Sequence, residues 1–404
     1  MAENIRKGKN TRRLYYEDAY IKEFEAKAEA CFLDKDGFWI MLDQTAFYPE
    51  GGGQPCDTGT FSVCEFGEIR QIQVHDVQEK DGRVLHFCKE KIEEGARVCG
   101  RIDWQRRLTH MREHSGEHII SGIICRRYGY SNIGFHMGKD FITIDFSGLL
   151  TEEEIAAAEK AANEKIMENA EIQAEYPDAD MLENMDYRSK KEVKGAIRIV
   201  TIPGADCCAC CGTHVKRTGE IGPVKVIGSE HYKSGIRLTL LVGEKALADY
   251  AVKSENVRKI SALLSVKPED TVCGVERLLD AMENLKQKYG SLKMQFLGQK
   301  VEAIEEGQKA TVLFEKDLSP LDMRKLADNL HKKAKFAAVF CGDDMTDYRY
   351  VMICNDMDIV DFGKTFQAAL GGRGGGRNPM IQGSTSASRT QIEAFLEKSG
   401  YLDF

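Results

Sequence analysis

Residues 114–118 read His-Ser-Gly-Glu-His, and residues 210–214 read Cys-Cys-Gly-Thr-His. Each run places two metal-binding side chains four positions apart: His114 with His118, and Cys210 with His214. Positions i and i+4 lie on one face of a helix, so both imidazoles of the first run can reach a single ion. The second run supplies a thiolate and an imidazole, which complete the tetrahedron that zinc prefers. The two runs together predict one Zn2+ ion per chain.

The cysteine that ligates this zinc stands in a crowded segment. Four cysteines fall within positions 207–211: Cys207, Cys208, Cys210 and Cys211. Cys210 has the same spacing to His214 as His114 has to His118, so we assign it as the ligand. The other three are expected to pack as small apolar side chains or to serve as reserve ligands.

The 404 residues are 42% hydrophobic and 30% charged, which is typical of a globular protein with two or three domains. The apolar runs are too short to cross a bilayer, and residues 1–13 are polar and basic, so no membrane partner is expected. The thirteen cysteines are an odd number and mostly scattered. They favour a reducing compartment over a disulfide framework and predict a cytoplasmic protein.

The formal net charge of −8 does not by itself indicate a nucleic-acid partner. If RNA binds, the basic side chains must be concentrated locally. Each of the candidate places also fits an ordinary solvated face: residues 6–13, residues 101–112, residues 188–194, and the pair Arg373 and Arg377.

The pattern of apolar residues predicts an α+β protein in four parts. These are a β-rich subdomain, a zinc-binding domain, a helical part and a small α/β domain, at residues 1–100, 101–242, 243–307 and 308–404. Strands are expected at residues 38–42, 71–75, 141–146, 197–202 and 236–242. One helix is expected at residues 104–128, around the first metal pair. Another is expected from Thr151, whose hydroxyl forms a capping box with Glu154, to residue 169.

The helical part has an apolar repeat at alternating steps of three and four, which is typical of a coiled coil. The repeat consists of Val275, Leu278, Met282, Leu285, Tyr289, Leu292 and Phe296. An earlier helix at residues 245–264 ends before Pro268, which favours an antiparallel hairpin. A coiled coil that dimerises the protein and an amphipathic helix on a globular core are the alternatives.

The last part is expected to contain strands at residues 311–314, 336–341 and 348–355, with a helix at 320–334 that opens at Ser319. A glycine run, Gly-Gly-Arg-Gly-Gly-Gly-Arg at residues 371–377, follows. Its backbone N–H groups could approach an anion beside Arg373 and Arg377, or the run could be a flexible loop. It lacks the lysine and hydroxyl of a Walker A loop, so we discount an NTPase.

Joined together, these motifs resemble the editing region of alanyl-tRNA synthetase and the AlaX proteins. The matching segments are T-A-F-Y-P-E-G-G-G-Q at 45–54, R-R-L-T-H-M-R-E-H-S-G-E-H at 106–118 and C-C-G-T-H-V-K-R-T-G-E-I-G at 210–222. The glycine run at 371–377, after D-F-G-K at 361–364, is similar to the DHH-associated domain that ends the synthetase and the long AlaX type.

The resemblance implies a hydrolase that deacylates alanine tRNA mischarged with serine or glycine. Ahead of the glycine motif there is no room for an aminoacylation domain, so we expect the hydrolase to act in trans. Thr45 and Gln54 match family positions that contact the substrate, and Gly51, Gly52 and Gly53 would allow the backbone to approach it closely. The domain that carries Arg373 and Arg377 is expected to contact tRNA or to support a homodimer.

Glu117 opens a rival interpretation, because His-x-x-Glu-His is also the inverted zincin signature, with the glutamate as the general base of a peptidase. That interpretation leaves Cys210, His214 and both glycine motifs unexplained. In a deacylase, Glu117 could act as a base or as a partner of a metal ligand. A third hypothesis is a tRNA-binding module in which the zinc is purely structural.

Overall fold

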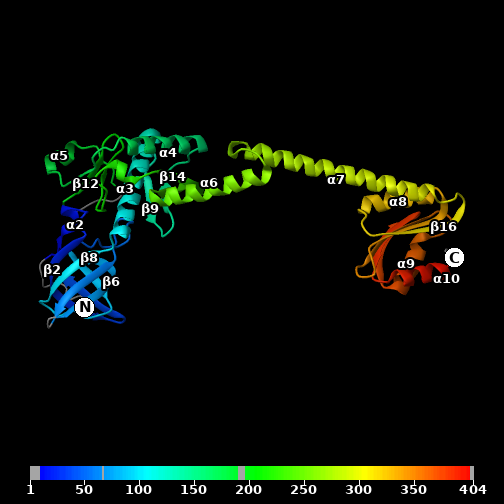
Figure 1. The fold of residues 1–404 in the computed structure, drawn as a ribbon, viewed down its shortest axis with the longest axis horizontal. Coiled ribbons are helices and arrows are strands. Elements are labelled where there is room, and N and C mark those ends of the chain that lie inside the picture. Colours follow the sequence, from blue (N-terminus) through cyan, green and yellow to red (C-terminus); the bar gives the residue numbers. More distant parts are fainter. Residues whose placement is uncertain (1–9, 66–67, 190–195, 401–404) are drawn as a thin grey trace. The chain divides into compact units, whose positions relative to one another are not determined.

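The computed structural model describes residues 10–65, 68–189 and 196–400. The chain divides into two compact units, Met1–Arg258 and Lys259–Phe404. Both contain helices and sheets, which confirms the α+β class (Figure 1). Two of the basic stretches named above lie partly outside the described residues, namely residues 6–9 and 190–194.

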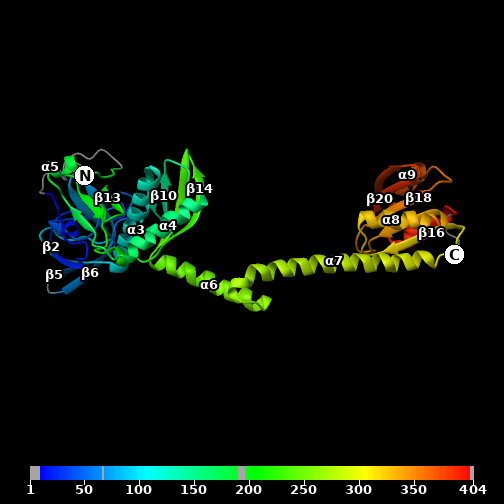
Figure 2. The same cartoon turned by 90° about the horizontal axis from the view of Figure 1, so that it is seen from above.

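A closed barrel of six antiparallel strands forms the N-terminal part of the first unit (Figure 2). Its strand order is β2-β3-β7-β6-β5-β8. Inward and outward side chains alternate along each strand, and the inward ones form one apolar core. The strand bounds are Glu23–Asp34 for β2, Gly37–Leu42 for β3, Gly59–Glu65 for β5, Glu68–Lys80 for β6, Arg83–Cys88 for β7 and Arg97–Ile102 for β8.

The rest of the first unit packs around helix α3, Trp104–Tyr128, which coincides with the predicted helix. Helix α4, Glu152–Met167, begins with the predicted capping box between Thr151 and Glu154. A four-stranded sheet has the order β14-β15-β10-β9, and a three-stranded sheet has the order β11-β12-β13. Their bounds are Asn132–Met137 for β9, Ile142–Phe146 for β10, Gln173–Glu175 for β11, Ile199–Ile202 for β12, Asp206–Ala209 for β13, Val224–Tyr232 for β14 and Gly235–Val242 for β15.

The first unit also contains short elements, among them the 3-10 helix Thr218–Ile221. Strands β1, Arg12–Arg13, and β4, Gln44–Thr45, pair in parallel beside the barrel. Helices α2, Leu14–Glu17, and α5, Ala179–Asn184, are a single turn or little more.

Helix α6, Glu244–Leu264, crosses the division between the units and is followed by α7, Thr271–Glu302. The C-terminal end of α7 is packed, since Leu297 and Val301 are buried in the core of the second unit. The residues of its predicted coiled-coil repeat are instead exposed: Val275, Leu278, Met282, Leu285, Tyr289, Leu292 and Phe296. The packing of another helix on this stripe remains a prediction.

The second unit is a five-stranded sheet with helices on both faces. Along β17, alternate residues face two different cores, one shared with α7 and α8 and the other with α9 and α10. The sheet order is β16-β17-β18-β20-β19. The bounds are Gln308–Glu315 for β16, Pro320–His331 for α8, Ala334–Cys341 for β17, Tyr348–Cys354 for β18, Ile359–Leu370 for α9, Gly372–Arg377 for β19, Met380–Thr385 for β20 and Arg389–Lys398 for α10.

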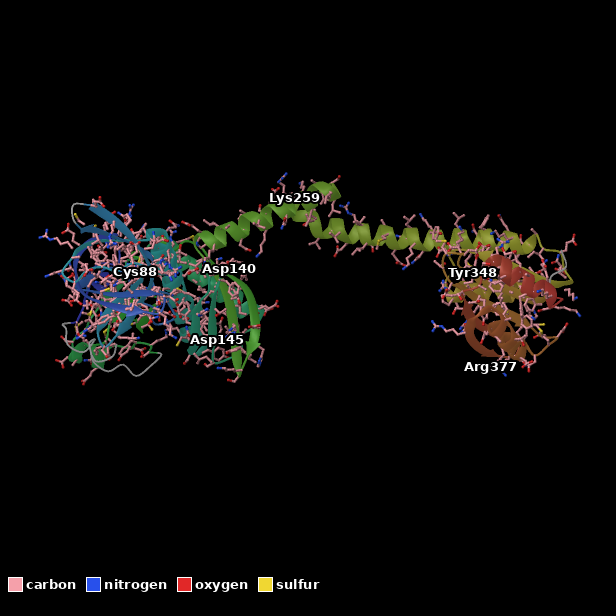
Figure 3. All side chains as sticks on the ribbon, turned by 90° about the horizontal axis from the view of Figure 1, so that it is seen from below. Cys88, Asp140, Asp145, Lys259, Tyr348 and Arg377 are labelled. Atoms are coloured by element: carbon pink, nitrogen blue, oxygen red, sulfur yellow. The ribbon has the colours of Figure 1, made fainter. Side chains whose placement is uncertain are left out.

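Residues Gly372–Arg377 of the glycine run form an edge strand, β19, so the alternative of a flexible loop does not hold. Its glycines permit a close approach that larger residues would prevent. A Cβ atom at Gly374 would lie 2.4 Å from the carbonyl oxygen of Gln382 and 2.8 Å from the hydroxyl of Tyr350. Arg373 and Arg377 are exposed on this edge, and Figure 3 labels Arg377.

A buried ion pair attaches α3 to the barrel. The Arg107 guanidinium, fully buried, donates to the Asp57 carboxylate and to the carbonyl oxygens of Ala19 and Ala46 at 2.8 and 2.6 Å. The backbone N–H of Tyr48 donates to the same carboxylate at 2.6 Å. For Arg107, the prediction of an RNA-facing side chain within residues 101–112 is therefore wrong. Within the described ranges, no helix is both long and apolar enough to cross a membrane.

Replacing Arg107 with methionine should strongly destabilise the first unit, because it leaves the Asp57 charge buried without a cation. The expected loss is about 3–5 kcal/mol of the free energy of unfolding. Both tryptophans, Trp39 and Trp104, lie in this unit, so urea unfolding followed by tryptophan fluorescence measures it.

The matched control is Arg101→Met. Its ion pair with Glu23 is mostly exposed, with side-chain exposures of 72% and 61%. The control should change the free energy by no more than about 1 kcal/mol. An equally small change in Arg107→Met would contradict the proposed role of the buried pair.

Candidate metal centre

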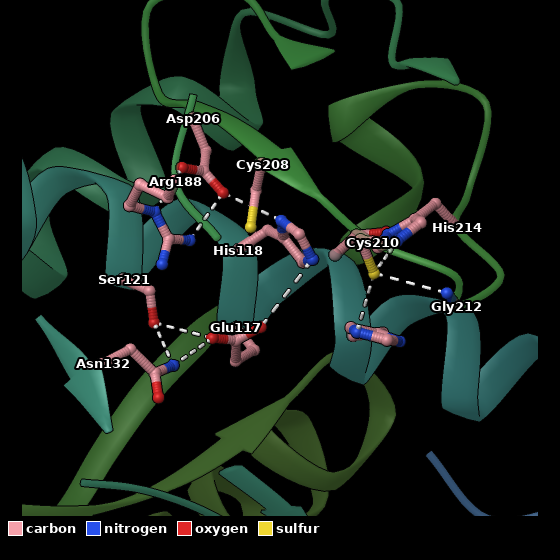
Figure 4. A network of polar contacts seen from close by, with 12 residues as sticks. Glu117, His118, Ser121, Asn132, Arg188, Asp206, Cys208, Cys210, Gly212 and His214 are labelled. Atoms are coloured by element: carbon pink, nitrogen blue, oxygen red, sulfur yellow. Dashed lines mark hydrogen bonds and ion pairs between the residues drawn. The ribbon is translucent and has the colours of Figure 1, made fainter. Parts of the chain in front are cut away.

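The four predicted ligands lie together in the first unit. One face of α3 presents His114 and His118, and the segment that follows β13 presents Cys210 and His214. Each residue offers one ligand atom, and these four atoms lie within 4.8 Å of one another (Figure 4). The three imidazoles are almost completely buried.

The spacing of the ligand atoms suits a tetrahedral ion. The Cys210 Sγ atom lies 3.5 Å from Nε2 of His114 and 3.5 Å from Nε2 of His214. A tetrahedral zinc with Zn–S of about 2.3 Å and Zn–N of about 2.0–2.1 Å separates sulfur and nitrogen by about 3.6 Å. The observed separations therefore leave room for one ion between these side chains.

Each imidazole is held through its other ring nitrogen. Nδ1 of His114 lies 2.9 Å from Oε1 of Gln54, and Nδ1 of His118 lies 2.8 Å from Oδ2 of Asp206. Nδ1 of His214 lies 3.1 Å from the Ser115 hydroxyl. A proton on each Nδ1 satisfies these bonds and leaves each Nε2 lone pair for a metal. The donor set therefore fits a divalent cation.

Electrostatics at the site favour a thiolate. Burial alone would raise the pKa of the Cys210 thiol, but the imidazoles of His114 and His118 outweigh it and hold that pKa well below its usual value. Burial lowers the pKa of His214 to about 3. A thiolate beside a neutral imidazole is the form in which both residues bind zinc.

The strand period explains which cysteine faces the site. Along β13 and the next residue, Asp206, Cys208 and Cys210 share one side, whereas Cys207 and Cys211 lie on the other. Gly212 then lets the chain pass close to the first histidine, since a Cβ atom there would lie 2.1 Å from Cε1 of His114.

Gln54 connects the barrel to this centre. Besides His114 Nδ1, its Oε1 accepts from the backbone N–H of Thr213 at 3.1 Å, and its Nε2 donates to the Thr213 hydroxyl at 2.8 Å. Gly52 and Gly53 precede it with φ of +61° and +87°, a conformation that suits glycine. A Cβ atom at Gly53 would lie 2.8 Å from the ring of Phe135, which packs against His114.

The other predicted site residues lie apart from the four ligands or beside only one of them. Thr45 lies inside the barrel, where its hydroxyl contacts Nε2 of His86 at 2.9 Å and accepts from the N–H of Phe47. The Glu117 carboxylate is buried, and its Oε2 lies 3.9 Å from Nε2 of His118. Arg373 and Arg377 belong to the second unit.

Two family models match parts of the first unit that contribute to the site. A model described as class II (A) tRNA synthetases matches residues 2–106, which include the barrel. A model described as the second additional domain of threonyl and alanyl tRNA synthetases matches residues 197–239, which include Cys210 and His214.

Similar whole proteins point the same way. The alanine–tRNA ligases of Pyrococcus furiosus and Thermococcus kodakarensis are each 32% identical to the chain, over 97% and 96% of its length. The alanyl-tRNA editing protein Aarsd1-B of Xenopus laevis is 28% identical over 90% of the chain and 88% of its own length.

The chain is a relative of the alanine–tRNA ligases and of an alanyl-tRNA editing protein. This confirms the resemblance that the motifs predict. The chain spans less than half of these ligases, 44% and 43% of their lengths, but most of the editing protein.

Several residues around the centre were missed by sequence reasoning. Ser115 and Asp206 contact ligand imidazoles directly. Arg188, Thr213 and Asn132 contact Asp206, Gln54 and Glu117, respectively. The alternation of Asp206, Cys208 and Cys210 is a signal that could have indicated Asp206. No comparable signal marks Arg188 or Asn132, because each reaches the centre from a distant part of the chain.

Zinc content should depend on Cys210 and not on its neighbour. Purified wild-type protein is expected to carry about one zinc ion per chain, and Cys210→Ser should lose it because the thiolate ligand is gone. Elemental analysis by inductively coupled plasma mass spectrometry measures the ratio. Cys211→Ser is the matched control, since Cys211 is adjacent and exposed, and it should keep the metal. Loss of zinc in the control, or its retention in Cys210→Ser, would overturn the ligand assignment.

Proposed function

We propose that this protein is a trans-editing hydrolase that removes serine or glycine from mischarged alanine tRNA. The observation that carries the proposal is the convergence of His114, His118, Cys210 and His214 beside the glycine motif that contains Gln54. The relatives named for charging tRNA with alanine and for editing alanyl-tRNA support the substrate class. The match to most of the editing protein supports action in trans.

The chain's own residues would bind and orient the ester. In the motif Gly51–Gly53, the backbone is open at Gly52, where no atom lies within 4 Å of a Cβ position, and Gly53 is packed against Phe135. An aminoacyl ester is already activated, so positioning it and a water molecule, with a donor for the oxyanion, can suffice without a covalent nucleophile. Zinc bound by all four side chains would help to orient the substrate, whereas zinc with one of these ligands displaced would supply a Lewis acid that polarises the ester or binds the acceptor end.

Gln54 and Thr45 have different parts in this proposal. Both ends of the Gln54 amide already bond His114 and Thr213, so Gln54 would act on the substrate through the position of the His114 ring. The Thr45 hydroxyl is engaged by His86 within the barrel. A direct contact with substrate would require Thr45 to exchange that partner.

The peptidase alternative is weaker on the same geometry. Glu117 is fully buried, and its Oε1 accepts from the Ser121 hydroxyl at 2.7 Å and from Nδ2 of Asn132 at 2.5 Å. A general base must reach a water molecule beside the substrate. We therefore do not assign Glu117 as a general base; its Oε2 lies 3.9 Å from Nε2 of His118, beside the candidate metal position.

Deacylation of seryl-tRNA for alanine tests the proposal directly. Wild-type protein should release serine faster than it releases alanine from alanyl-tRNA. Replacing His114 with alanine should lower the rate by more than about a hundredfold, since the loss of a ligand exceeds the loss of an outer partner. His136→Ala is the control, because His136 is exposed on β9 of the same unit and outside the cluster.

Three outcomes would each contradict the proposal. Binding of tRNA without release of serine would favour the non-catalytic module. Cleavage of casein that depends on Glu117 would favour the peptidase. A rate in His114→Ala equal to that in His136→Ala would remove the metal centre from the reaction.

Arg373 and Arg377 are proposed to contact the tRNA backbone from the exposed edge of β19. Neutralising both to alanine should lower the slope of log Kd against log salt by up to about 1.8, because each phosphate contact contributes about 0.9. Fluorescence anisotropy with labelled tRNA at several salt concentrations measures this slope. The matched control is Lys325→Ala with Lys398→Ala, two exposed cations on α8 and α10. An unchanged slope in the arginine variant would contradict the contact.

A homodimer formed through α7 or the C-terminal unit is a further part of the proposal. It is supported by the exposed apolar side chains along α7, of which Leu285 is 67% and Leu292 66% exposed. Such a stripe commonly marks an interaction surface. A cytoplasmic location remains a prediction from the cysteine content.

A further inference from the structure

A buried ionic chain runs from Arg188 through Asp206 to His118, behind the candidate ligands (Figure 4). The Arg188 guanidinium donates to both carboxylate oxygens of Asp206, from Nε at 2.7 Å and from Nη2 at 2.7 Å. Oδ2 of Asp206 also accepts from Nδ1 of His118 at 2.8 Å. The Asp206 side chain is only 1% exposed.

Backbone hydrogen bonds hold Arg188 beside Asp206. The N–H of Arg188 donates to the carbonyl oxygen of Cys207 at 2.8 Å, and the N–H of Ala209 donates back to Arg188 at 2.8 Å. Arg188 is thus attached directly to the strand that presents Asp206. On the other side, Gly122 lets α3 approach, since a Cβ atom there would lie 2.3 Å from the carbonyl oxygen of Ala205.

Asp206 differs from the partners of the other two imidazoles. Gln54 and Ser115, which hold His114 and His214, are neutral, whereas Asp206 is acidic. Oδ2 of Asp206 accepts from both Arg188 and His118, so this acidic side chain is fixed by the arginine on one side and by the imidazole on the other.

We propose that Asp206, locked in place by Arg188, is the positioning residue that makes His118 an Nε2 ligand and sets the affinity of the metal centre. A carboxylate that accepts from Nδ1 fixes the tautomer and the orientation of the ring and makes Nε2 a stronger donor. The inference rests on the metal centre proposed above. For Arg188 alone, the pairing with Asp206 argues against the RNA contact considered for residues 188–194.

A purely structural ion pair would behave differently. It would contribute to the stability of the metal-free fold and leave the metal affinity of the folded protein unchanged. The two roles are therefore separated by measuring zinc affinity and the stability of the metal-free protein in the same variants.

The decisive variant is Asp206→Asn. Three N–H donors, two from Arg188 and one from His118, meet the carboxylate, and an amide would replace one acceptor with a further donor. The matched control is Asp145→Asn. Figure 3 labels Asp145. Asp145 forms the same kind of two-point pair with Arg237, at 2.6 and 2.9 Å, in the same unit and apart from the four ligands.

Zinc dissociation constants are measured by competition with a chromophoric chelator, and circular dichroism and tryptophan fluorescence check the metal-free fold. Asp206→Asn should weaken zinc binding by about 10- to 100-fold. It should also change the cobalt-substituted absorption spectrum and the nitrogen chemical shifts that report the His118 tautomer. Asp145→Asn should stay within about threefold of wild type.

Arg188→Lys is the second variant, and it keeps the proposal testable if Asp206→Asn does not fold. Lysine retains the charge but cannot make the two-point contact, so zinc binding should again weaken. Unchanged zinc affinity and cobalt spectrum in either folded variant would overturn the proposal and leave the metal centre standing. A wild-type protein that binds no zinc would overturn both.

Discussion

A thiolate and three imidazoles that lie so close together in a buried space form a donor set that suits a shared cation. The ring centroids of His114, His118 and His214 lie 4.6–5.2 Å apart, and the Cys210 sulfur stands among them. Burying a charged group without a partner costs several kcal/mol, so a cation shared by these side chains would stabilise the arrangement. The rest of the first unit is organised to hold these four side chains in place.

Three separate parts of the chain meet at this constraint. The barrel contributes Gln54, α3 contributes His114 and His118, and the segment after β13 contributes Cys210 and His214. The Arg107–Asp57 pair fixes α3 to the barrel, and Asp206 fixes it to β13. Because each imidazole has a partner at its Nδ1 atom, the ligands are preorganised, which suits the proposed orientation of an ester.

Part of the fold and of the candidate site could be predicted from the sequence. Local signals were sufficient for α3, for the start of α4 at Thr151 and for eight of the strands, since periodicity and capping act within a few residues. Closure of the barrel depends on the pairing of β2 with β8. The sequence of either strand alone does not indicate this pairing. The ligands had spacing as a signal, whereas Arg188 and Asn132 depend on tertiary contacts. The glycine run misled because composition cannot distinguish a loop from a strand pressed against its neighbour.

The central claim is that one zinc ion is bound by three nitrogen atoms and one sulfur. X-ray absorption at the zinc edge of the purified protein tests it most directly. The account predicts a first shell that fits about three Zn–N distances of 2.0–2.1 Å and one Zn–S distance of about 2.3 Å. A shell with two or more sulfur atoms, a shell of oxygen alone, or a protein without zinc would contradict it.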